Sequence, residues 1–109
     1  MIDVDTLPAC PVETTLTLIS DKWKILIVRD LLTGTKRFSE LRRSIGHISQ
    51  KVLTSNLRQM EADGLVHRKV YPEVPPRVEY SLTDTGHSLK TVIDALWNWG
   101  EDYKAKLAA

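Results

Sequence analysis

The sequence has a single cysteine and no long hydrophobic run. The first feature excludes a protein held together by internal disulfides, and the second excludes a membrane-spanning protein. With only Cys10 among 109 residues, no disulfide can form within one chain, which favours a reducing compartment such as the cytoplasm. The most apolar short stretch, residues 25–28, is far shorter than a membrane span. Residues 1–7 carry Asp3 and Asp5, where a secretory signal would have a basic start and an apolar run. We therefore expect a cytoplasmic protein without a membrane partner.

Motifs of enzymes and metal sites are also missing from the sequence. It contains no nucleophile elbow, no phosphate-binding glycine loop and no zinc-ligand spacing. The three histidines, His47, His67 and His87, have no acidic partner at a useful spacing. Internal repeats and low-complexity segments are absent as well. We predict that the chain is not an enzyme and holds neither a metal nor a cofactor.

The charge is small overall but unevenly distributed. The net charge is +1, from 15 Lys/Arg and 14 Asp/Glu. Residues 36–80 hold nine Lys/Arg and five Asp/Glu, a balance of +4, which leaves −3 for the two flanks. A basic middle segment suggests an anionic partner, although a charged surface is the commoner meaning of such residues. The length of 109 residues fits one domain, with residues 1–9 as a flexible N-terminal segment.

Apolar spacing and capping residues predict four helices before residue 65. Their ranges are 11–19, 21–32 capped by Ser20, a short helix over 38–45, and 50–63 capped by Ser49. Gly46 and Gly64 end the last two of these helices.

After Gly64 the apolar spacing changes from helical to alternating. Residues 66–71 and 77–82 alternate in the manner of strands. The prolines in residues 72–76 predict a stiff hairpin tip. A final helix over 84–106 follows, with Thr83 as its cap. The predicted class is mainly α with a small β-hairpin (α+β), the winged helix-turn-helix plan, with a long C-terminal helix for dimerisation.

The helix over 50–63 is the predicted recognition helix, because the major groove of DNA admits one helix whose polar face can reach base edges. Its predicted base-contacting residues lie opposite the apolar face and near its N-terminus; they are Gln50, Lys51, Thr54 and Ser55, together with the cap Ser49. Arg58 lies further along and is predicted to contact a phosphate or a guanine edge. A solvated polar helix face is the alternative interpretation.

The hairpin over 65–82 is the predicted wing, which would contact phosphates or the minor groove. Its basic residues are Arg68, Lys69 and Arg77, and the alternative for them is cross-strand pairing with Glu73 or Glu79. Further contacts to the DNA backbone are predicted around the third helix, from one or two of the residues Lys36, Arg37, Arg42 and Arg43, of which Lys36 and Arg37 are the favoured candidates.

The apolar stripe of the last helix would lack a full partner in so small a domain, which favours a homodimer. The stripe consists of Leu89, Val92, Ile93, Leu96, Trp97 and Tyr103. The alternative is packing on the first helix of the same chain. Trp23 is expected in the core, Trp97 in the core or the dimer seam, and Trp99 off the main stripe and partly exposed or interfacial.

Cys10 precedes Pro11 at a predicted helix start, where the helix N-terminus favours the reactive thiolate, although Asp3 and Asp5 oppose it. Oxidation could yield a sulfenic acid, a mixed disulfide or a bridge between subunits. The alternative is a small buried apolar residue.

These stretches together resemble the HxlR-type winged-helix regulators, bacterial relatives of the MarR group. The resemblance covers about residues 10–105 and is carried by 10–12, 21–23, 37–41, 48–54, Leu57, 61–66, 75–83 and Gly86. The chain departs from the family pattern at Ser20, where Gly is frequent, and at Gly46-His47, where Pro-Gly is frequent.

The resemblance implies a homodimer that binds double-stranded DNA at a roughly palindromic operator, usually to repress a nearby gene. It also implies that Cys10 senses oxidants or electrophiles. From the sequence, the hypothesis is therefore a dimeric, sequence-specific transcription regulator. The competing hypothesis is a winged-helix module that binds protein and not DNA.

Overall fold

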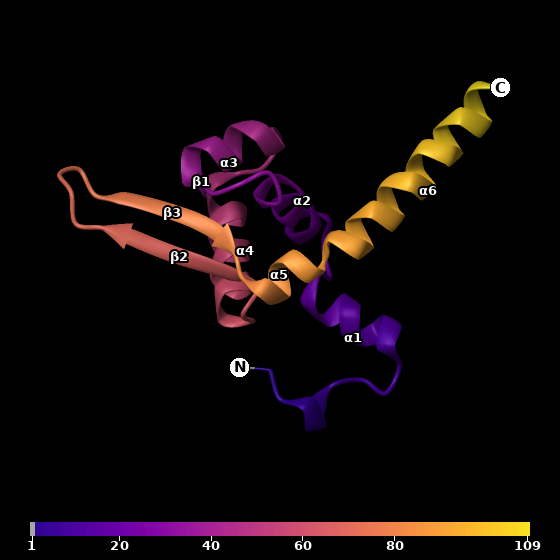
Figure 1. Ribbon diagram of the computed structural model, residues 1–109, viewed down its shortest axis with the longest axis horizontal. Helices are drawn as coiled ribbons and strands as arrows, with labels where there is room; N and C mark the ends of the chain where they lie inside the picture. The colour runs from indigo at the N-terminus through magenta and orange to yellow at the C-terminus, as the bar shows by residue number, and fades with distance from the viewer. Residues whose placement is uncertain (1) are drawn as a thin grey trace.

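A computed structural model describes residues 2–109 (Figure 1). The described elements, in chain order, are the 3-10 helix η1 (Val4–Thr6), α1 (Pro11–Leu18), α2 (Lys22–Leu31), β1 (Lys36–Arg37), α3 (Phe38–Ile45), α4 (Gln50–Ala62), β2 (Val66–Tyr71), β3 (Arg77–Leu82), α5 (Asp84–Ser88) and α6 (Lys90–Ala108). The hairpin of β2 and β3 projects at one end, α2 to α4 form the body, and α6 extends away at the other end. The predicted class, mainly α with a small β component in a winged helix-turn-helix plan, is confirmed.

The sheet has one strand more than the predicted hairpin. β2 and β3 have the predicted bounds, and β1 joins them to give an antiparallel sheet in the order β1-β3-β2. β1 pairs Lys36 with Tyr80 and Arg37 with Glu79. Two residues are too few to show an alternating pattern, so only the pairing with β3 reveals this strand.

The core lies where α2, α3 and α4 meet the base of the sheet. Its buried apolar residues come from every element of the body; the fully buried ones are Ile27, Val28, Leu31, Leu41, Leu53, Leu57, Met60, Leu65 and Val66. Burial of these side chains is the main favourable term in the folding of the body. The predicted apolar face of α4 therefore rests on the core, and its opposite face is free.

A glycine ends α4 and directs the chain into the hairpin. Gly64 has a φ of 77°, in the left-handed region that favours glycine. The N–H of Gly64 donates to the carbonyl of Glu61 at 3.1 Å, and the N–H of Leu65 donates to the carbonyl of Met60 at 2.9 Å. This pair of bonds is the Schellman motif, and it places Leu65 in the core.

The chain after β3 is fastened to the same turn. The Thr83 hydroxyl donates to the carbonyl of Gly64 at 2.6 Å and accepts from the N–H of Gly86 at 3.0 Å. A Cβ at position 86 would clash with the carbonyl oxygen of Leu65. Glycine at 86 is therefore required by the close approach of two backbone segments.

The predicted helix over 84–106 is wrong in its continuity, because the structure has two helices in its place. α5 ends at Ser88 and α6 starts at Lys90, and buried Leu89 stands between them. α5 packs against β3, whereas α6 packs against α2. The chain changes direction to satisfy both contacts, which the helical spacing of the sequence does not indicate.

Aspartates cap the helices α2 and η1 in the N-terminal part of the chain. Asp21, not Ser20, caps α2, because its carboxylate accepts from the N–H of Lys24 at 3.0 Å. Within the segment 1–9, the Asp3 carboxylate caps η1, and the flexibility of that segment stays a prediction. Met1 lies outside the described residues. None of the described helices is both long and apolar enough to cross a bilayer.

Candidate nucleic-acid interface

The predicted recognition helix is held at its N-terminus by the predicted cap. The Ser49 hydroxyl accepts from the N–H of Val52 at 3.1 Å, and Leu53 and Leu57 anchor the helix in the core. The cap satisfies one of the backbone donors that a helix start leaves free. As an acceptor, the Ser49 oxygen keeps its own proton available for a further hydrogen bond.

The free face of α4 carries the other predicted contact residues together. Gln50, Lys51, Ser55 and Arg58 are exposed and Thr54 is half-buried. With Gln59 they line one groove along the helix. Gln59 was not predicted, although its spacing of four residues from Ser55 places it on this face. The charges along this groove are those of Lys51 and Arg58, so its surface is electropositive and polar.

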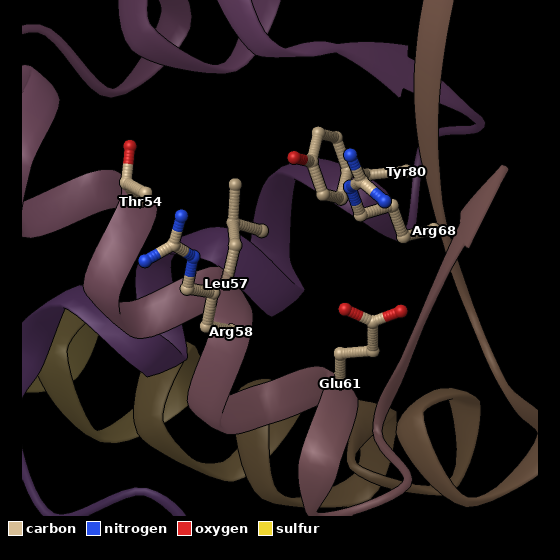
Figure 2. Close-up of a pocket in the computed structure, with 6 residues that line it drawn as sticks. All are labelled: Thr54, Leu57, Arg58, Glu61, Arg68 and Tyr80. Carbon is tan, nitrogen blue, oxygen red and sulfur yellow. The ribbon is translucent and has the colours of Figure 1, made fainter. Parts of the chain in front are cut away.

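A second cavity opens between α4 and the hairpin. It has a volume of about 430 Å³ and is lined by Thr54, Leu57, Arg58, Glu61, Arg68 and Tyr80 (Figure 2). We call it the α4–wing cavity. The structure brings predicted Arg58 and Arg68 to the same cavity and adds Glu61 and Tyr80, which sequence reasoning missed. Their apolar or acidic character gave no sign of a nucleic-acid contact, and only the packing of the β2–β3 hairpin against α4, through β2, brings them together.

Arg77 occupies a different environment from Arg68. Its guanidinium lies 3.2 Å from a Glu73 oxygen and 3.4 Å from a Glu79 oxygen. It also stacks over the ring of Tyr71, 3.8 Å from the ring centroid. This pairing is the alternative interpretation of the sequence, and it leaves the Arg77 charge locally neutralised. A role of Arg77 in DNA binding stays a prediction.

Strand alternation separates the wing cations onto two faces. Lys69 lies opposite Glu79 in the ladder, and its ammonium is 4.9 Å from the centroid of the Tyr71 ring. Lys69 and Arg77 therefore share the outer face of the hairpin, because residues two apart point to one side. Arg68 pairs with Tyr80 on the face toward α4.

The predicted backbone contacts around α3 lie near the sheet edge. Arg37 is exposed and Lys36 is half-buried in β1, and the N–H of Arg37 donates to the Glu40 carboxylate at 2.8 Å. Arg42 and Arg43 are exposed on α3. The Arg42 guanidinium donates to the carbonyl of Ile48 at 3.4 Å, which ties α3 to the turn before α4.

The C-terminal helix divides its predicted stripe between two environments. Leu89 is buried, and Val92 and Ile93 pack against the core of the same chain. Further along, the helix leaves the body (Figure 1), and apolar side chains there are exposed. These are Leu96, Trp97, Trp99, Tyr103 and Leu107.

The aromatic residues follow the predictions in part. Trp23 is half-buried against the core, as expected. Trp97 is 63% exposed, so it lies outside the core of the chain. Trp99 is exposed, in line with its prediction, and its ring stacks on that of Tyr103 with centroids 5.2 Å apart.

The cysteine is accessible. Cys10 is exposed and stands directly before α1, at the N-cap position. The alternative of a buried apolar residue is therefore wrong. Among residues 2–109, no group of three or more His, Cys, Asp or Glu side chains is arranged to hold a metal ion.

Comparison with known proteins identifies the family of this chain. The sequence pattern of the HxlR-like helix-turn-helix family matches residues 18–108. The HTH-type transcriptional regulator YdeP of Bacillus subtilis (strain 168) is 48% identical over 103 residues, which cover 94% of this chain and 80% of YdeP.

Solved structures agree with this relationship. The redox regulator HypR in its reduced form has a TM-score of 0.84 and 46% identity, covering 91% of this chain and 98% of HypR. A transcriptional regulator of the MarR family from Porphyromonas gingivalis W83 has a TM-score of 0.82 and 38% identity, with 93% and 95% covered. These relatives are transcriptional regulators and not enzymes, which confirms the prediction on that point. The chain belongs to the HxlR-like helix-turn-helix family and is a transcriptional regulator of the helix-turn-helix type.

Proposed function

We propose that this regulator is a homodimer that binds a palindromic operator in double-stranded DNA and represses the adjacent gene. The observation that carries the proposal is the free polar face of α4, which is capped at Ser49 and anchored on the core. Such a face presents hydrogen-bonding side chains to base edges in the major groove. Gln50 and Thr54 supply base contacts, and Lys51 and Arg58 add charge.

The wing supplies the contacts that carry no sequence information. Arg68, Lys69 and Arg77, together with Lys36 and Arg37, contribute phosphate or minor-groove contacts beside the recognition helix. Contacts of this kind set the position and orientation of α4 on the duplex. Their contribution to affinity falls as salt rises, because each neutralised phosphate releases counterions.

Dimerisation is supported by the exposed apolar residues of α6. Leu96, Trp97 and Tyr103 were predicted at the seam, and Trp99 and Leu107 extend the same surface. The exposed Val12 and Leu16 of α1 add a second uncovered strip. A second copy of the chain would remove this surface from water, and its two-fold symmetry would place two recognition helices on two half-sites.

Selection of bound duplexes from a random pool tests the DNA proposal, followed by titration of the selected duplex at several salt concentrations. We expect an enriched inverted repeat and a steep fall of affinity with salt. Gln50→Ala and Thr54→Ala should change the preferred sequence, by about 1–3 kcal/mol per lost base contact. If the folded dimer enriches no duplex sequence from the pool, the proposal of DNA binding fails, and a module that binds proteins is favoured.

The repressor role has a separate test in a reporter strain. A reporter gene is placed behind the selected operator, and its expression is measured with and without the regulator. Expression should rise when the regulator is removed. A fall in expression would make the protein an activator and overturn this part of the proposal.

We further propose that Cys10 makes DNA binding responsive to oxidants, as its exposure before α1 and the likeness to the redox regulator HypR suggest. Diamide is a suitable oxidant: two thiols lose two protons and two electrons, a sulfur–sulfur bond forms, and diamide becomes the hydrazine. The second thiol comes from the partner subunit or from a small thiol. Operator affinity should change with diamide and return with dithiothreitol. A Cys10→Ser variant that still responds would end the proposal.

A further inference from the structure

The α4–wing cavity has walls from two separately positioned elements. Thr54, Leu57, Arg58 and Glu61 follow one another at helical spacing on the side of α4 that faces the sheet. Arg68 and Tyr80 are directly opposite each other in the β2–β3 ladder. The cavity is therefore framed by a rigid helix and a paired ladder, which hold its polar groups in place.

The polar groups of the cavity suit an oxyanion. Arg58 and Arg68 supply guanidinium donors, and Thr54 and Tyr80 supply hydroxyls. Among residues 2–109, the ion pairs include Arg29 and Arg77 but neither Arg58 nor Arg68. These two guanidiniums thus keep their full capacity for an external acceptor, and phosphate accepts bidentate bonds from guanidinium.

One carboxylate opposes the two cations. In Figure 2 the Glu61 carboxylate points up toward Arg68, and the Arg68 guanidinium lies beside the Tyr80 ring, whose hydroxyl points toward α4. The charges that line the cavity sum to +1 with Glu61 ionised. The volume of about 430 Å³ exceeds that of a phosphate group, so part of a sugar and bridging waters fit beside it.

The position of the cavity indicates which molecule supplies the oxyanion. Thr54 and Arg58 line both this cavity and the groove along the free face of α4. When that face lies in a major groove, base edges meet the middle of the face. The sugar-phosphate strand bordering the groove then passes over the side of α4 that faces the wing. A backbone phosphate is therefore the DNA group nearest the cavity.

We propose that the α4–wing cavity binds one backbone phosphate of each operator half-site, held by Arg58, Arg68 and the Tyr80 hydroxyl. The inference rests on the proposed DNA-binding function and deepens it. Because one ligand comes from the recognition helix and two come from the wing, the phosphate fixes how far α4 can slide along the groove. Glu61 lowers the affinity for that phosphate by like-charge repulsion. Lys69 and Arg77, on the other face of the hairpin, take no part in it.

The test uses the full-length dimer and the selected operator, with methylphosphonate replacing single phosphates in turn. This substitution removes one negative charge of the backbone. Wild-type protein should lose about 10-fold or more in affinity at one position of each half-site. Arg68→Gln and Arg58→Gln should be weaker on unmodified DNA and lose little further at that position. If the cavity binds only a free anion, the Arg substitutions and the methylphosphonate at any position will weaken binding independently of each other.

The salt dependence supplies a second readout. Each of the two Arg variants should make the slope of log affinity against log salt shallower by about 0.9 per subunit. Tyr80→Phe keeps the packed ring and should weaken binding, whereas Glu61→Gln should strengthen it on operator and random duplex alike. Lys22→Gln, an equal charge change on α2, is the matched control and should leave the methylphosphonate pattern unchanged.

The failure of this inference can be distinguished from the failure of the proposed function. If wild-type dimer selects no duplex, the DNA-binding proposal fails, and the phosphate inference fails with it. If wild type binds its operator normally but no methylphosphonate position couples to Arg58 or Arg68, the cavity does not bind a backbone phosphate. The DNA-binding function then stands without it.

Discussion

Trp97→Ala should separate the two subunits of the proposed dimer. Trp97 is 63% exposed in the single chain. Since a buried Trp contributes up to roughly 250 Å², about 160 Å² is available for a partner to cover. At about 25 cal/mol per Å², full coverage amounts to about 4 kcal/mol per subunit. If the partner covers half of this area, each copy contributes about 2 kcal/mol.

A two-fold interface contains two copies of Trp97, so the variant should weaken the dimer by about 4 kcal/mol. This corresponds to a roughly 1,000-fold higher dissociation constant. Sedimentation equilibrium over a concentration series measures that constant directly. Operator affinity should fall with it, because a monomer holds only one half-site.

Val74→Ala is the matched control for the dimer prediction. Val74 is a fully exposed apolar residue at the hairpin tip, far along the chain from α6. Its truncation should leave the dissociation constant of the dimer unchanged. If Trp97→Ala dimerises as tightly as wild type and Val74→Ala, the exposed face of α6 is not the seam, and the area argument is refuted.

Substitutions at three further positions test other parts of the structure. Glu79→Gln removes one of the two carboxylates on Arg77, so binding to random duplex should strengthen and its salt slope should steepen; unchanged titrations would show that Arg77 stays away from DNA. Gly86→Ala forces a Cβ against the Leu65 carbonyl and should lower the free energy of unfolding by about 1–3 kcal/mol in urea titrations, and an unchanged midpoint would contradict the close approach. Ser49→Ala removes the cap of α4 and should destabilise by about 1 kcal/mol, whereas Ser49→Asp, which can still cap, should retain stability.

Local signals in the sequence predicted most of the elements. Alternation predicted β2 and β3, and the cap at Ser49 with the glycine at 64 predicted the two ends of α4. These features depend on residues within a few positions of each other. Capping, turn chemistry and side-chain periodicity act at that range, so they can be recognised without a fold.

Features that depend on distant partners were predicted poorly. β1 exists because Lys36 and Arg37 pair with β3, more than 40 residues later. The break at Leu89 arises because α5 and α6 pack on different elements. Arg68 and Arg77 have the same side chain in one hairpin, yet the ladder turns one toward α4 and the other into a cluster of carboxylates.

Local patterns and motif order in the sequence were sufficient to predict the winged-helix plan, the helix α4 with its polar face, and the family. Which side chains a partner can reach depends on contacts between distant segments. Long-range packing brings Glu61, Arg68 and Tyr80 to one cavity and leaves the outer half of α6 uncovered, whereas Arg77 pairs with Glu73 and Glu79 of its own hairpin. The residue types show which side chains are charged and which are apolar. Whether a partner can reach one of these side chains depends on the neighbours that surround it in the folded chain.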